Sequence, residues 1–375
     1  MLFTRTRTIC STAFLLLLGA ATAWGQANGN LQLHFIDVGQ GDGALMITPA
    51  GKVVLFDAGM DLGVENCTKI TSYLDQLGIT AIDAIVVSHY HTDHIGCLPE
   101  VLEGRTLSGL VYDRGQSYTT QSYKRYVAAV KEHRQATVLG DTVSFDTGAN
   151  QVLMRVIAVN GAGVPTTNEN DLSVAVTVAF GNFRAEIGGD LSGEDTDNYA
   201  DIETVVAPNV GPLDVYKVHH HCSKYSTNAN WLLTTSPTVG IISTGDTNTY
   251  GHPAPACLDR LHQAGTKMYW TERGNGGPPT AGVDKIGKNI IVEMAPGANT
   301  YTVQYSGGTD THALKNTAGT PPPIAPKFSW SARPGARLYH LSTCAYVGNI
   351  SPANLQRGDT PPPNKTLHAD CPVHH

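Results

Sequence analysis

The sequence lacks two features that would assign it to large classes of protein. Beyond the N-terminus, no segment approaches the ~20 consecutive apolar residues that a transmembrane helix needs. Basic residues are also scarce, since 25 lysines and arginines face 32 aspartates and glutamates, which gives a formal net charge of -7. This balance argues against a broad basic face that holds duplex DNA by releasing counterions. Any contact with nucleic acid would therefore be local.

The N-terminus has the pattern of a secretory signal peptide over residues 1–25. Arg5 and Arg7 precede an apolar run at 13–20, and small residues suited to cleavage follow it. The apolar run is too short to cross a bilayer, although a retained N-terminal anchor is the alternative. We therefore expect an exported protein, in a periplasm or outside the cell, without a stable membrane span.

The cysteines point to the same compartment. Of seven cysteines, Cys10 lies in the predicted signal peptide, and the remaining six are an even number that favours disulfide bonds in an exported chain. Six cysteines allow many pairings, among which the sequence alone does not choose. We predict the pairs Cys67–Cys97, Cys222–Cys257 and Cys344–Cys371.

Residues 29–308 alternate short β runs with helical stretches and form one predicted domain. The β runs are apolar and separated by turn residues, which predicts strands at 31–38, 44–48, 52–56, 82–87, 151–159, 172–180, 183–187, 214–218, 239–243, 267–271, 289–294 and 301–304. Apolar residues at helical spacing predict helices at 64–77, 94–102, 122–134 and 254–264. Runs of strands with interleaved helices predict an α/β fold in which helices cover two packed sheets.

Two further regions follow this domain. Residues 309–327 are rich in Gly, Ala, Thr and Pro, including three consecutive prolines at 321–323, which predicts a stiff, extended linker. Residues 328–375 form a small module that contains cysteine and histidine and is too short to build much core by itself.

The most informative segment, residues 88–94, contains the signature H-x-H-x-D-H. His89 and His91 follow an apolar run at 82–87, so both can leave a strand end on one side and bind the same cation. Asp93 and His94 lie where the loop turns into a helix and can face a second cation. A histidine-rich surface loop is the alternative in a chain with 15 histidines. The order of ligand types favours a metal site, and mixed nitrogen and oxygen donors suit zinc.

Two later strand ends carry residues of the same kind. The run at 183–187 leads into two glycines and Asp190, and a strand-end carboxylate beside flexible backbone can bridge two cations. The run at 214–218 leads into three histidines at 219–221. Each cluster alone is weak evidence, because an aspartate after two glycines is usually a turn and a histidine triplet is often a solvated loop.

Taken in order, these three clusters resemble the motifs of metallo-β-lactamase-fold hydrolases. Further motifs make the chain similar to the hydrolase domain of the competence protein ComEC and its stand-alone relatives; they lie at 35–42, 55–59, 168–173, 217–226 and 248–253. Together the motifs span nearly all of residues 31–275, and their joint occurrence is highly specific. The resemblance implies an αββα sandwich, with a small C-terminal appendage here, and a two-metal centre at one edge of its sheets.

The resemblance also implies which residues bind two divalent cations. Carried over by position, the set is His89 and His91 for metal one, Asp93 and His94 for metal two, Asp190 as the bridge, and His221 as the remaining ligand of metal two. His221 is chosen because the family's His-His pair usually precedes a glycine, which Cys222 replaces here. His220 would then lie beside it and contact substrate.

The chain departs from the family pattern at metal one. Many relatives place a third histidine between the opening motif and the bridging aspartate, but here that interval contains only His133, inside a predicted helix. The sequence Asn-Glu-Asn-Asp at 168–171 occupies the appropriate region. Water or oxygen donors would then complete metal one, which favours manganese or partial zinc occupancy over a zinc pair bound only by nitrogen.

Such a centre suits hydrolysis. Two divalent cations would lower the pKa of a bridging water, present hydroxide to an electrophile, and stabilise both the attacking and leaving oxygens of a phosphodiester. Asp93 could also orient the nucleophile. His220 and His252 could donate hydrogen bonds to a phosphate or protonate a leaving oxygen. A structural turn histidine beside Pro253 is the alternative for His252.

Other polar residues around these motifs have supporting roles. We predict that four of them orient metal ligands without binding metal, with ordinary turn chemistry as the alternative: Asp37, Gln40, Asp42 and Asp57. Four cations could supply local positive charge for an anion, although solvated surface cations are the favoured interpretation: Lys217, Lys224, Arg260 and Lys267.

The C-terminal module contains two short Cys/His motifs. His340 with Cys344 and His368 with Cys371 have the spacings H-x3-C and H-x2-C, which could form a small zinc knot. The arrangement loosely resembles the metal-binding module of Ada-type DNA-repair methyltransferases. A Cys344–Cys371 disulfide in an oxidising compartment is the favoured alternative.

The combined prediction is an exported two-metal hydrolase, a phosphodiesterase or nuclease that acts through a metal-bound hydroxide, with DNA or nucleotides as the favoured substrates. One rival is a hydrolase of another ester or amide, such as a choline-phosphate ester, a lactone or a β-lactam; the absent third histidine argues against a β-lactam. The other rival is a catalytically inactive, metal-dependent binding protein, which the intact ligand spacing disfavours. The sequence identifies no protein partner.

Overall fold

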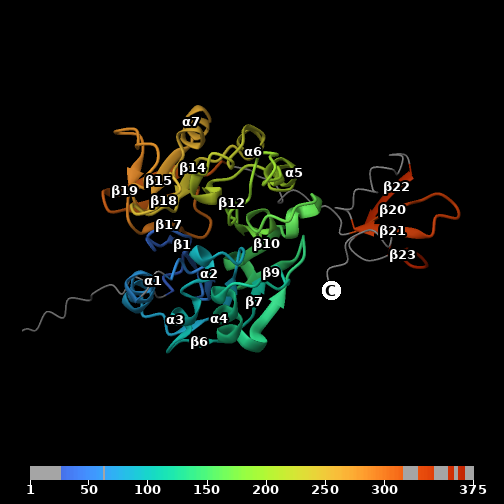
Figure 1. Ribbon diagram of the computed structural model, residues 1–375, viewed down its shortest axis with the longest axis horizontal. Helices are drawn as coiled ribbons and strands as arrows, with labels where there is room; N and C mark the ends of the chain where they lie inside the picture. The colour runs from blue at the N-terminus through green and yellow to red at the C-terminus, as the bar shows by residue number, and fades with distance from the viewer. Residues whose placement is uncertain (1–26, 62–63, 316–327, 342–353, 359–361, 368–375) are drawn as a thin grey trace, which may run out of the picture.

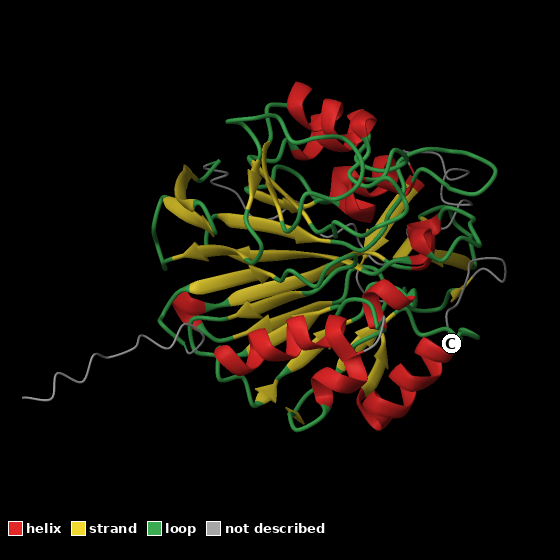
Figure 2. Ribbon diagram, turned by 60° about the vertical axis from the view of Figure 1, so that its left-hand side comes forward, coloured by secondary structure: helices red, strands yellow, loops and turns green. Residues whose placement is uncertain are grey.

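The computed structural model describes residues 27–61, 64–315, 328–341, 354–358 and 362–367. Two β-sheets lie face to face in the main domain, and helices cover both outer faces (Figure 1, Figure 2). This arrangement confirms the predicted αββα sandwich. The predicted signal peptide at 1–25 lies outside the described residues. Within those residues, no helix has the length and apolar character required to cross a membrane.

The first sheet has the strand order β19-β18-β17-β1-β2-β3-β5-β7-β8 among the described residues. Its strands are β1 (Leu31–Phe35), β2 (Ala44–Ile47), β3 (Val53–Phe56), β5 (Ala84–Val86), β7 (Val111–Asp113), β8 (Arg134–Ala136), β17 (Ile290–Met294), β18 (Thr300–Tyr305) and β19 (Gly308–Ala313). The pairs β3–β5, β5–β7 and β7–β8 are parallel, and the other pairs are antiparallel.

The second sheet has the order β16-β15-β14-β13-β12-β11-β10-β9 within the same ranges. Its strands are β9 (Thr142–Phe145), β10 (Val152–Ala158), β11 (Ala175–Phe180), β12 (Phe183–Ile187), β13 (Val215–Lys217), β14 (Val239–Ile242), β15 (Lys267–Trp270) and β16 (Lys285–Ile286). The strands from β12 to β16 pair in parallel, whereas those from β9 to β12 pair in antiparallel.

Three apolar layers hold the sandwich together. Side chains that alternate along β1 and β2, such as Leu33 and Met46, meet Met154 and Val178 of the second sheet in the central layer. The outer face of the first sheet packs on α1 (Val64–Gln76), α3 (Leu98–Leu102) and α4 (Gln121–Val130). The outer face of the second sheet packs on α5 (Ile202–Val206), α6 (Ala229–Thr235) and α7 (Pro255–Gln263). Because both faces of each sheet are covered, central strands such as β1, β2, β3 and β13 are buried along their whole length.

The predicted helix at 94–102 is divided in the structure. Residues Thr92–Ile95 form the single turn α2, and α3 begins at Leu98 after Gly96 and Cys97. Pro99 lacks the N–H that a continuous helix would use to bond the carbonyl of residue 95, which ends α2 early. The division lets the predicted metal-binding motif leave the sheet on its own short turn.

The predicted linker begins too early. Gly308–Ala313 forms β19, which pairs with β18 from Thr300 to Tyr305, and Leu314 reaches the core. The threonines at 309 and 311 are β-branched and suit an edge strand. The Gly, Ala, Thr and Pro content of the whole segment 309–327 nevertheless predicts a linker. The rest of the predicted linker, 316–327, lies outside the described residues.

Two small sheets complete the described chain. One pairs β4 (Ala81–Ile82) with β6 (Thr106–Leu107) in the main domain. The other lies in the C-terminal module and has the order β22-β20-β21-β23, formed by β20 (Phe328–Ser331), β21 (Leu338–Leu341), β22 (Leu355–Gly358) and β23 (Thr366–Leu367). The predicted domain boundary at 328 therefore coincides with the start of a strand.

Two of the predicted disulfides are confirmed. Cys67 of α1 is bonded to Cys97 at the start of α3, and Cys222 after β13 is bonded to Cys257 of α7. The second bond ties the turn that carries the histidine triplet to a helix on the outer face. The predicted Cys344–Cys371 pair lies outside the described residues.

Candidate metal centre

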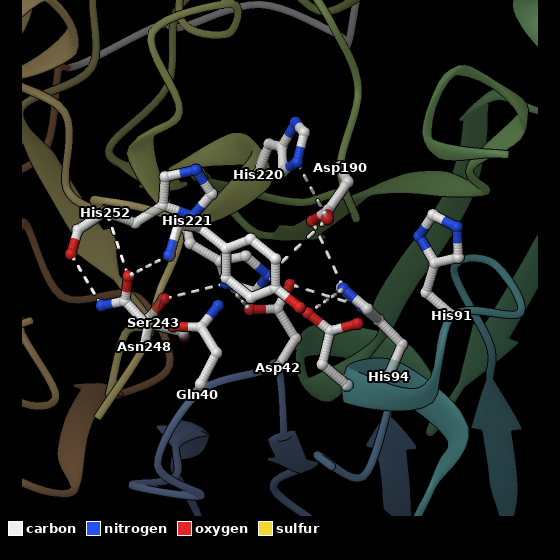
Figure 3. A network of polar contacts seen from close by, with 12 residues as sticks. Gln40, Asp42, His91, His94, Asp190, His220, His221, Ser243, Asn248 and His252 are labelled. Atoms are coloured by element: carbon white, nitrogen blue, oxygen red, sulfur yellow. Dashed lines mark hydrogen bonds and ion pairs between the residues drawn. The ribbon is translucent and has the colours of Figure 1, made fainter. Parts of the chain in front are cut away.

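Parallel strands bring the predicted metal ligands to one edge of the sandwich. The segment 89–94 follows β5, Asp190 follows β12, and His221 follows β13. β12 and β13 are parallel neighbours in the second sheet, so Asp190 and His221 follow them at the same edge of that sheet. The segment 89–94 comes from β5 of the facing first sheet and meets them there. Figure 3 shows Asp190 between His220 and His94, with His221 beside them and His91 to one side.

Four side chains converge as ligands of one cation would. Asp93, His94, Asp190 and His221 each offer a ligand atom within 4.8 Å of the others. His94 Nε2 lies 3.4 Å from Asp190 Oδ1, and His221 Nε2 lies 3.3 Å from Asp93 Oδ2 and 3.6 Å from Asp190 Oδ2. Two nitrogen and two oxygen donors form a set suited to tetrahedral zinc.

The atoms that face one another in this cluster have no hydrogen-bond partners among the described residues. They are His94 Nε2, His221 Nε2 and Asp190 Oδ1, and all three are buried. Buried polar atoms without partners are costly in a folded protein unless water or an ion satisfies them. The residues therefore fit the cation that the sequence predicts as metal two.

The predicted ligands of metal one are less completely assembled. His89 Nε2 lies 4.0 Å from Asp190 Oδ2 and 3.0 Å from Nδ1 of His91. His91 thus reaches the cluster through His89. His220 Nε2 approaches the same oxygen of Asp190, at 3.7 Å. Three imidazoles and one carboxylate oxygen therefore gather where metal one is predicted, in a looser arrangement than at metal two.

Neighbouring carboxylates fix the orientation of the ligand rings. Asp57 Oδ2 lies 2.8 Å from Nδ1 of His94, and Asp57 also accepts hydrogen bonds from the Ser88 N–H and hydroxyl. His221 Nδ1 lies 3.0 Å from the Ser243 carbonyl oxygen and 3.3 Å from Asp42 Oδ1. In both rings Nδ1 is held, so Nε2 is left to face the cluster.

The imidazoles and carboxylates of the cluster shift one another's pKa values toward the charged forms. Burial disfavours the charged form of His221, but Asp190 and Asp42 outweigh this effect and raise its pKa to about 10. The pKa of His94 is likewise raised well above its usual value by Asp190 and Asp93, against the effect of burial. Burial favours the neutral form of Asp190, yet the neighbouring imidazoles lower its pKa well below the ordinary range. A bound cation would replace the protons on these imidazoles.

With this geometry established, comparison with known proteins identifies the family. Residues 43–246, more than half of the chain, match the metallo-beta-lactamase superfamily. The chain belongs to this superfamily of metal-dependent hydrolases.

Curated relatives share much of the chain. It is 26% identical to Recombination protein 2 of Haemophilus influenzae over 258 residues, which cover 68% of this chain and 29% of that protein. It is 25% identical to ComE operon protein 3 of Bacillus subtilis over 285 residues, which cover 70% of this chain and 34% of that protein. The chain thus spans about a third of the length of these relatives. They confirm the predicted resemblance to competence proteins.

A shorter match links the chain to a nuclease. Endoribonuclease ysh1 of Schizosaccharomyces pombe is 29% identical over 84 residues, which cover 21% of this chain and 11% of that protein.

The three consecutive histidines of this superfamily member have three different environments. His221 faces the cluster, and His220 lies between Asp190 and Asn170, whose Nδ2 is 3.3 Å from His220 Nε2. His219 points the other way, with Nδ1 2.8 Å from Glu203 and Nε2 3.1 Å from Glu186. Burial opposes charge on His219, but these two buried carboxylates raise its pKa to about 9. The two carboxylates therefore favour the charged form of this buried imidazole.

The segment 168–171 does not supply a carboxylate to metal one. Glu169 binds Arg114 through both of its oxygens and accepts a hydrogen bond from the Tyr90 N–H. Asp171 accepts hydrogen bonds from Thr166 and Ala200. Asn170 alone approaches the centre, through His220, and its Oδ1 is buried without a hydrogen-bond partner among the described residues.

His252 lies beside the cluster and is buried. Its ring centroid is 5.5 Å from that of His220 and 5.9 Å from that of His221. Burial and the nearby imidazoles lower the pKa of His252 to about 3, and burial lowers that of His220 to about 4. Both rings are therefore neutral near pH 7, when each has one N–H to donate.

The other predicted supporting residues have different positions. Gln40 accepts a hydrogen bond from the Gly245 N–H, at 3.3 Å, beside the centre (Figure 3). Asp37 lies 2.9 Å from Lys69 Nζ and also accepts a hydrogen bond from the Gly39 N–H. Asp42 forms a buried ion pair with Lys217 in addition to its contact with His221.

The prediction that Lys217 is a solvated cation is wrong. Its side chain is 2% exposed and pairs with Asp42, since β13 is buried on both faces and a lysine there requires an anionic partner. Arg260 donates to the carbonyls of Lys224, Ser226 and Thr227. Lys224 and Lys267 are exposed, as predicted.

Sequence reasoning missed the two buried ion groups behind the ligands, Glu186–His219–Glu203 and Asp42–Lys217. A charged residue between two apolar ones of a strand, as Glu186 is between Ala185 and Ile187 of β12, was the available signal. The predicted C-terminal site of His340, Cys344, His368 and Cys371 cannot be placed, since these cysteines, His368 and the His340 side chain lie outside the described part of the chain.

Proposed function

We propose that this chain is an exported phosphodiesterase or nuclease that uses two divalent cations, zinc or manganese. One observation carries the proposal: ligand atoms of Asp93, His94, Asp190 and His221 converge, and among the described residues His94 Nε2, Asp190 Oδ1 and His221 Nε2 are buried there without a hydrogen-bond partner. Membership of a metal-dependent hydrolase superfamily and the short match to an endoribonuclease support hydrolysis of a phosphodiester.

The residues divide between two cation positions. Asp93, His94, Asp190 and His221 would hold one cation, and His89, His91 and Asp190 would hold the other. When bound, the cations would supply the Lewis acidity that activates water and stabilises charge on a phosphoryl group. Asp190 fits the bridging role, because its carboxylate lies near imidazoles of both groups: Oδ1 is 3.4 Å from His94, and Oδ2 is 3.6 Å from His221 and 4.0 Å from His89.

The protein's own side chains would position the reactants. Asp93 is anionic, since nearby imidazoles lower its pKa despite burial, and can accept a hydrogen bond from the attacking water. His220 and His252 are neutral at pH 7 and each can donate one N–H to a phosphate oxygen. Their lowered pKa values favour this hydrogen-bonding role over proton donation to the leaving oxygen.

Two observations support export. Disulfide bonds persist mainly in oxidising compartments, and two of them tie the elements around the centre. The pattern at 1–25 is that of a signal peptide. Secretion of the full-length protein with cleavage near residue 25, read by N-terminal sequencing, would test this part of the proposal.

A substrate panel tests the proposed chemistry. Purified protein is loaded with zinc, manganese or magnesium and assayed against single-stranded DNA, bis-p-nitrophenyl phosphate, a lactone and nitrocefin. We expect metal-dependent cleavage of the two phosphodiesters, abolished in His91→Ala and Asp190→Ala. Matched controls are His133→Ala, whose ring contacts the Gly109 carbonyl, and Asp75→Ala, an exposed carboxylate beside Arg105.

The outcomes separate the rival functions. Activity that survives both His91→Ala and Asp190→Ala would refute the metal assignment. Cleavage of the lactone or nitrocefin alone would move the substrate class away from phosphodiesters. Metal binding without cleavage of any substrate would favour a binding protein.

A further inference from the structure

The turn that carries His220 and His221 has an unusual backbone. His220, His221 and Cys222 follow one another with φ angles of 50°, 52° and 61°. This left-handed region is unfavourable for residues other than glycine, because the Cβ atom comes close to the following carbonyl oxygen. Such residues persist only where the surrounding structure holds them. The turn must therefore be fixed by contacts outside itself.

The left-handed turn directs two adjacent imidazoles to the same carboxylate. His220 Nε2 lies 3.7 Å from Asp190 Oδ2, and His221 Nε2 lies 3.6 Å from the same oxygen. Adjacent side chains of an extended strand point to opposite faces, so a simple continuation of β13 would separate the two rings. The arrangement of imidazoles at the centre thus depends on the conformation of this turn.

A disulfide bond fixes the last residue of the turn. Cys222 is bonded to Cys257 of α7, and its carbonyl accepts a hydrogen bond of 2.7 Å from the Ala254 N–H. Both cysteines are fully buried in the outer apolar layer, together with Trp231 and Leu258. Cys222 is therefore held through its side chain and through its carbonyl, and both contacts lead to the segment that begins α7.

Hydrogen bonds hold the earlier residues of the turn. The His220 N–H donates to the Gly189 carbonyl at 3.2 Å, and the Ser223 N–H donates to the His220 carbonyl at 2.8 Å. The Ser226 hydroxyl donates to the His219 carbonyl at 2.8 Å. Single hydrogen bonds contribute little net stability each, whereas the disulfide is a covalent connection. The disulfide is thus the strongest restraint on this backbone.

The segment that holds Cys222 also carries His252. His252 precedes Ala254 by two residues and Cys257 by five. Its ring centroid is 5.5 Å from that of His220 and 5.9 Å from that of His221, and Figure 3 shows the three imidazoles together. The disulfide therefore connects the two backbone segments from which these three rings project.

We propose that Cys222 and Cys257 are positioning residues of the metal centre, because their disulfide keeps the turn at 220–222 left-handed. The bond would set His221 for the cation and His220 for a phosphate oxygen. A glycine at 222 would adopt this backbone without such a restraint, but the chain has a cysteine there. The expected effect on catalysis rests on the proposed function, whereas the expected effect on zinc binding does not.

Two double variants separate the bond from the turn that it holds. Cys222→Ala/Cys257→Ala removes the bond and leaves a Cβ atom at position 222. We expect it to weaken zinc binding roughly tenfold, measured by chelator competition, and to lower kcat/KM for bis-p-nitrophenyl phosphate by a similar factor. Cys222→Gly/Cys257→Ala removes the same bond but tolerates the left-handed φ angle, and should recover most of both losses. A general loss of stability would affect the two variants alike.

The other disulfide provides the matched control. Cys67–Cys97 has a sequence separation of 30, against 35 for Cys222–Cys257, so removing either bond should cost similar stability. Cys67→Ala/Cys97→Ala should nevertheless change zinc affinity much less than Cys222→Ala/Cys257→Ala does. Urea unfolding shows whether each protein is folded under the assay conditions. If the alanine pair at 222 and 257 does not fold, Cys257→Ala alone keeps the native side chain at 222 and replaces it.

The zinc affinities decide the inference. It would be overturned by wild-type zinc affinity in folded Cys222→Ala/Cys257→Ala, or by equal losses in the alanine and glycine variants. An equal loss in Cys67→Ala/Cys97→Ala would also overturn it, because the effect would then follow from lower stability. If the wild-type protein hydrolyses no phosphodiester, the proposed function fails, while the zinc affinities of the variants still test the role of the disulfide.

Discussion

His94 and Asp57 are joined by a 2.8 Å contact between Nδ1 and Oδ2, which leaves Nε2 of the imidazole facing Asp190. The same carboxylate accepts hydrogen bonds from Ser88, so its position is fixed from two sides. A residue that follows β3 therefore sets the orientation of a predicted ligand that follows β5. This contact leads to the first prediction.

Asp57→Asn should weaken zinc binding by roughly 10- to 100-fold, the usual effect of losing a residue that orients a ligand. An amide N–H turned toward Nδ1 of His94 would place the imidazole proton on Nε2, the atom needed for the metal. Affinity is measured by competition with a coloured chelator. Asp37→Asn is the control, because Asp37 contacts Lys69. Equal affinities for wild type and Asp57→Asn would contradict the orienting role.

Zinc affinity should rise with pH. The pKa of His221 is raised from 6.5 to about 10, and that of His94 is also raised, so both imidazoles are protonated in the metal-free protein near pH 7. Zinc must displace these protons, and fewer remain to be displaced as pH approaches about 10. Calorimetry in buffers of different ionisation enthalpy measures the protons released. Binding without proton release at pH 7 would exclude His94 and His221 as ligands.

Substitution of His219 should mainly reduce stability, whereas substitution of the adjacent His220 should mainly reduce activity. His219→Leu leaves Glu186 and Glu203 buried without a cation, and we expect it to lower the free energy of unfolding by about 3–5 kcal/mol. His220→Ala should reduce phosphodiester cleavage with a much smaller loss of stability. Urea unfolding and activity assays on both variants measure this. A stable His219→Leu protein would show that the buried carboxylates need no charged partner.

The disulfide between Cys222 and Cys257 should contribute substantially to stability. It closes a loop with a sequence separation of 35, for which the chain-entropy relation gives about 3–4 kcal/mol. Replacing both cysteines with alanine should lower the free energy of unfolding by this amount, as measured by urea unfolding of the oxidised protein. An equal shift of the unfolding midpoint by dithiothreitol in this variant and in the wild type would contradict the prediction. The shift would then come from another disulfide.

Local patterns predicted much of the fold. The strand at 183–187 and most of the helix at 64–77 agree with the structure, because alternation and helical spacing report burial directly. The edge strand β19 and the short helix α5 were missed. Their stability comes from partners distant in sequence, such as the pairing of β19 with β18, and local composition does not encode these partners.

In the candidate site, too, some features could be predicted from the sequence and others depend on partners distant in the chain. The resemblance to metallo-β-lactamase-fold hydrolases predicted that Asp190 and His221 would meet the segment 89–94. The pairing of Lys217 with Asp42, 175 residues apart in the chain, depends on the packing of two sheets and could not be anticipated from either segment. The separate orientations of His219, His220 and His221 likewise depend on the positive φ angles of the last two residues.

The most direct measurement is anomalous diffraction at the zinc absorption edge from crystals of the protein grown with zinc. We predict a strong peak enclosed by Asp93, His94, Asp190 and His221, with a second, weaker peak near His89 and His91. A zinc-loaded crystal with no peak among the first four residues, or with zinc bound elsewhere only, would contradict the assignment of the metal centre.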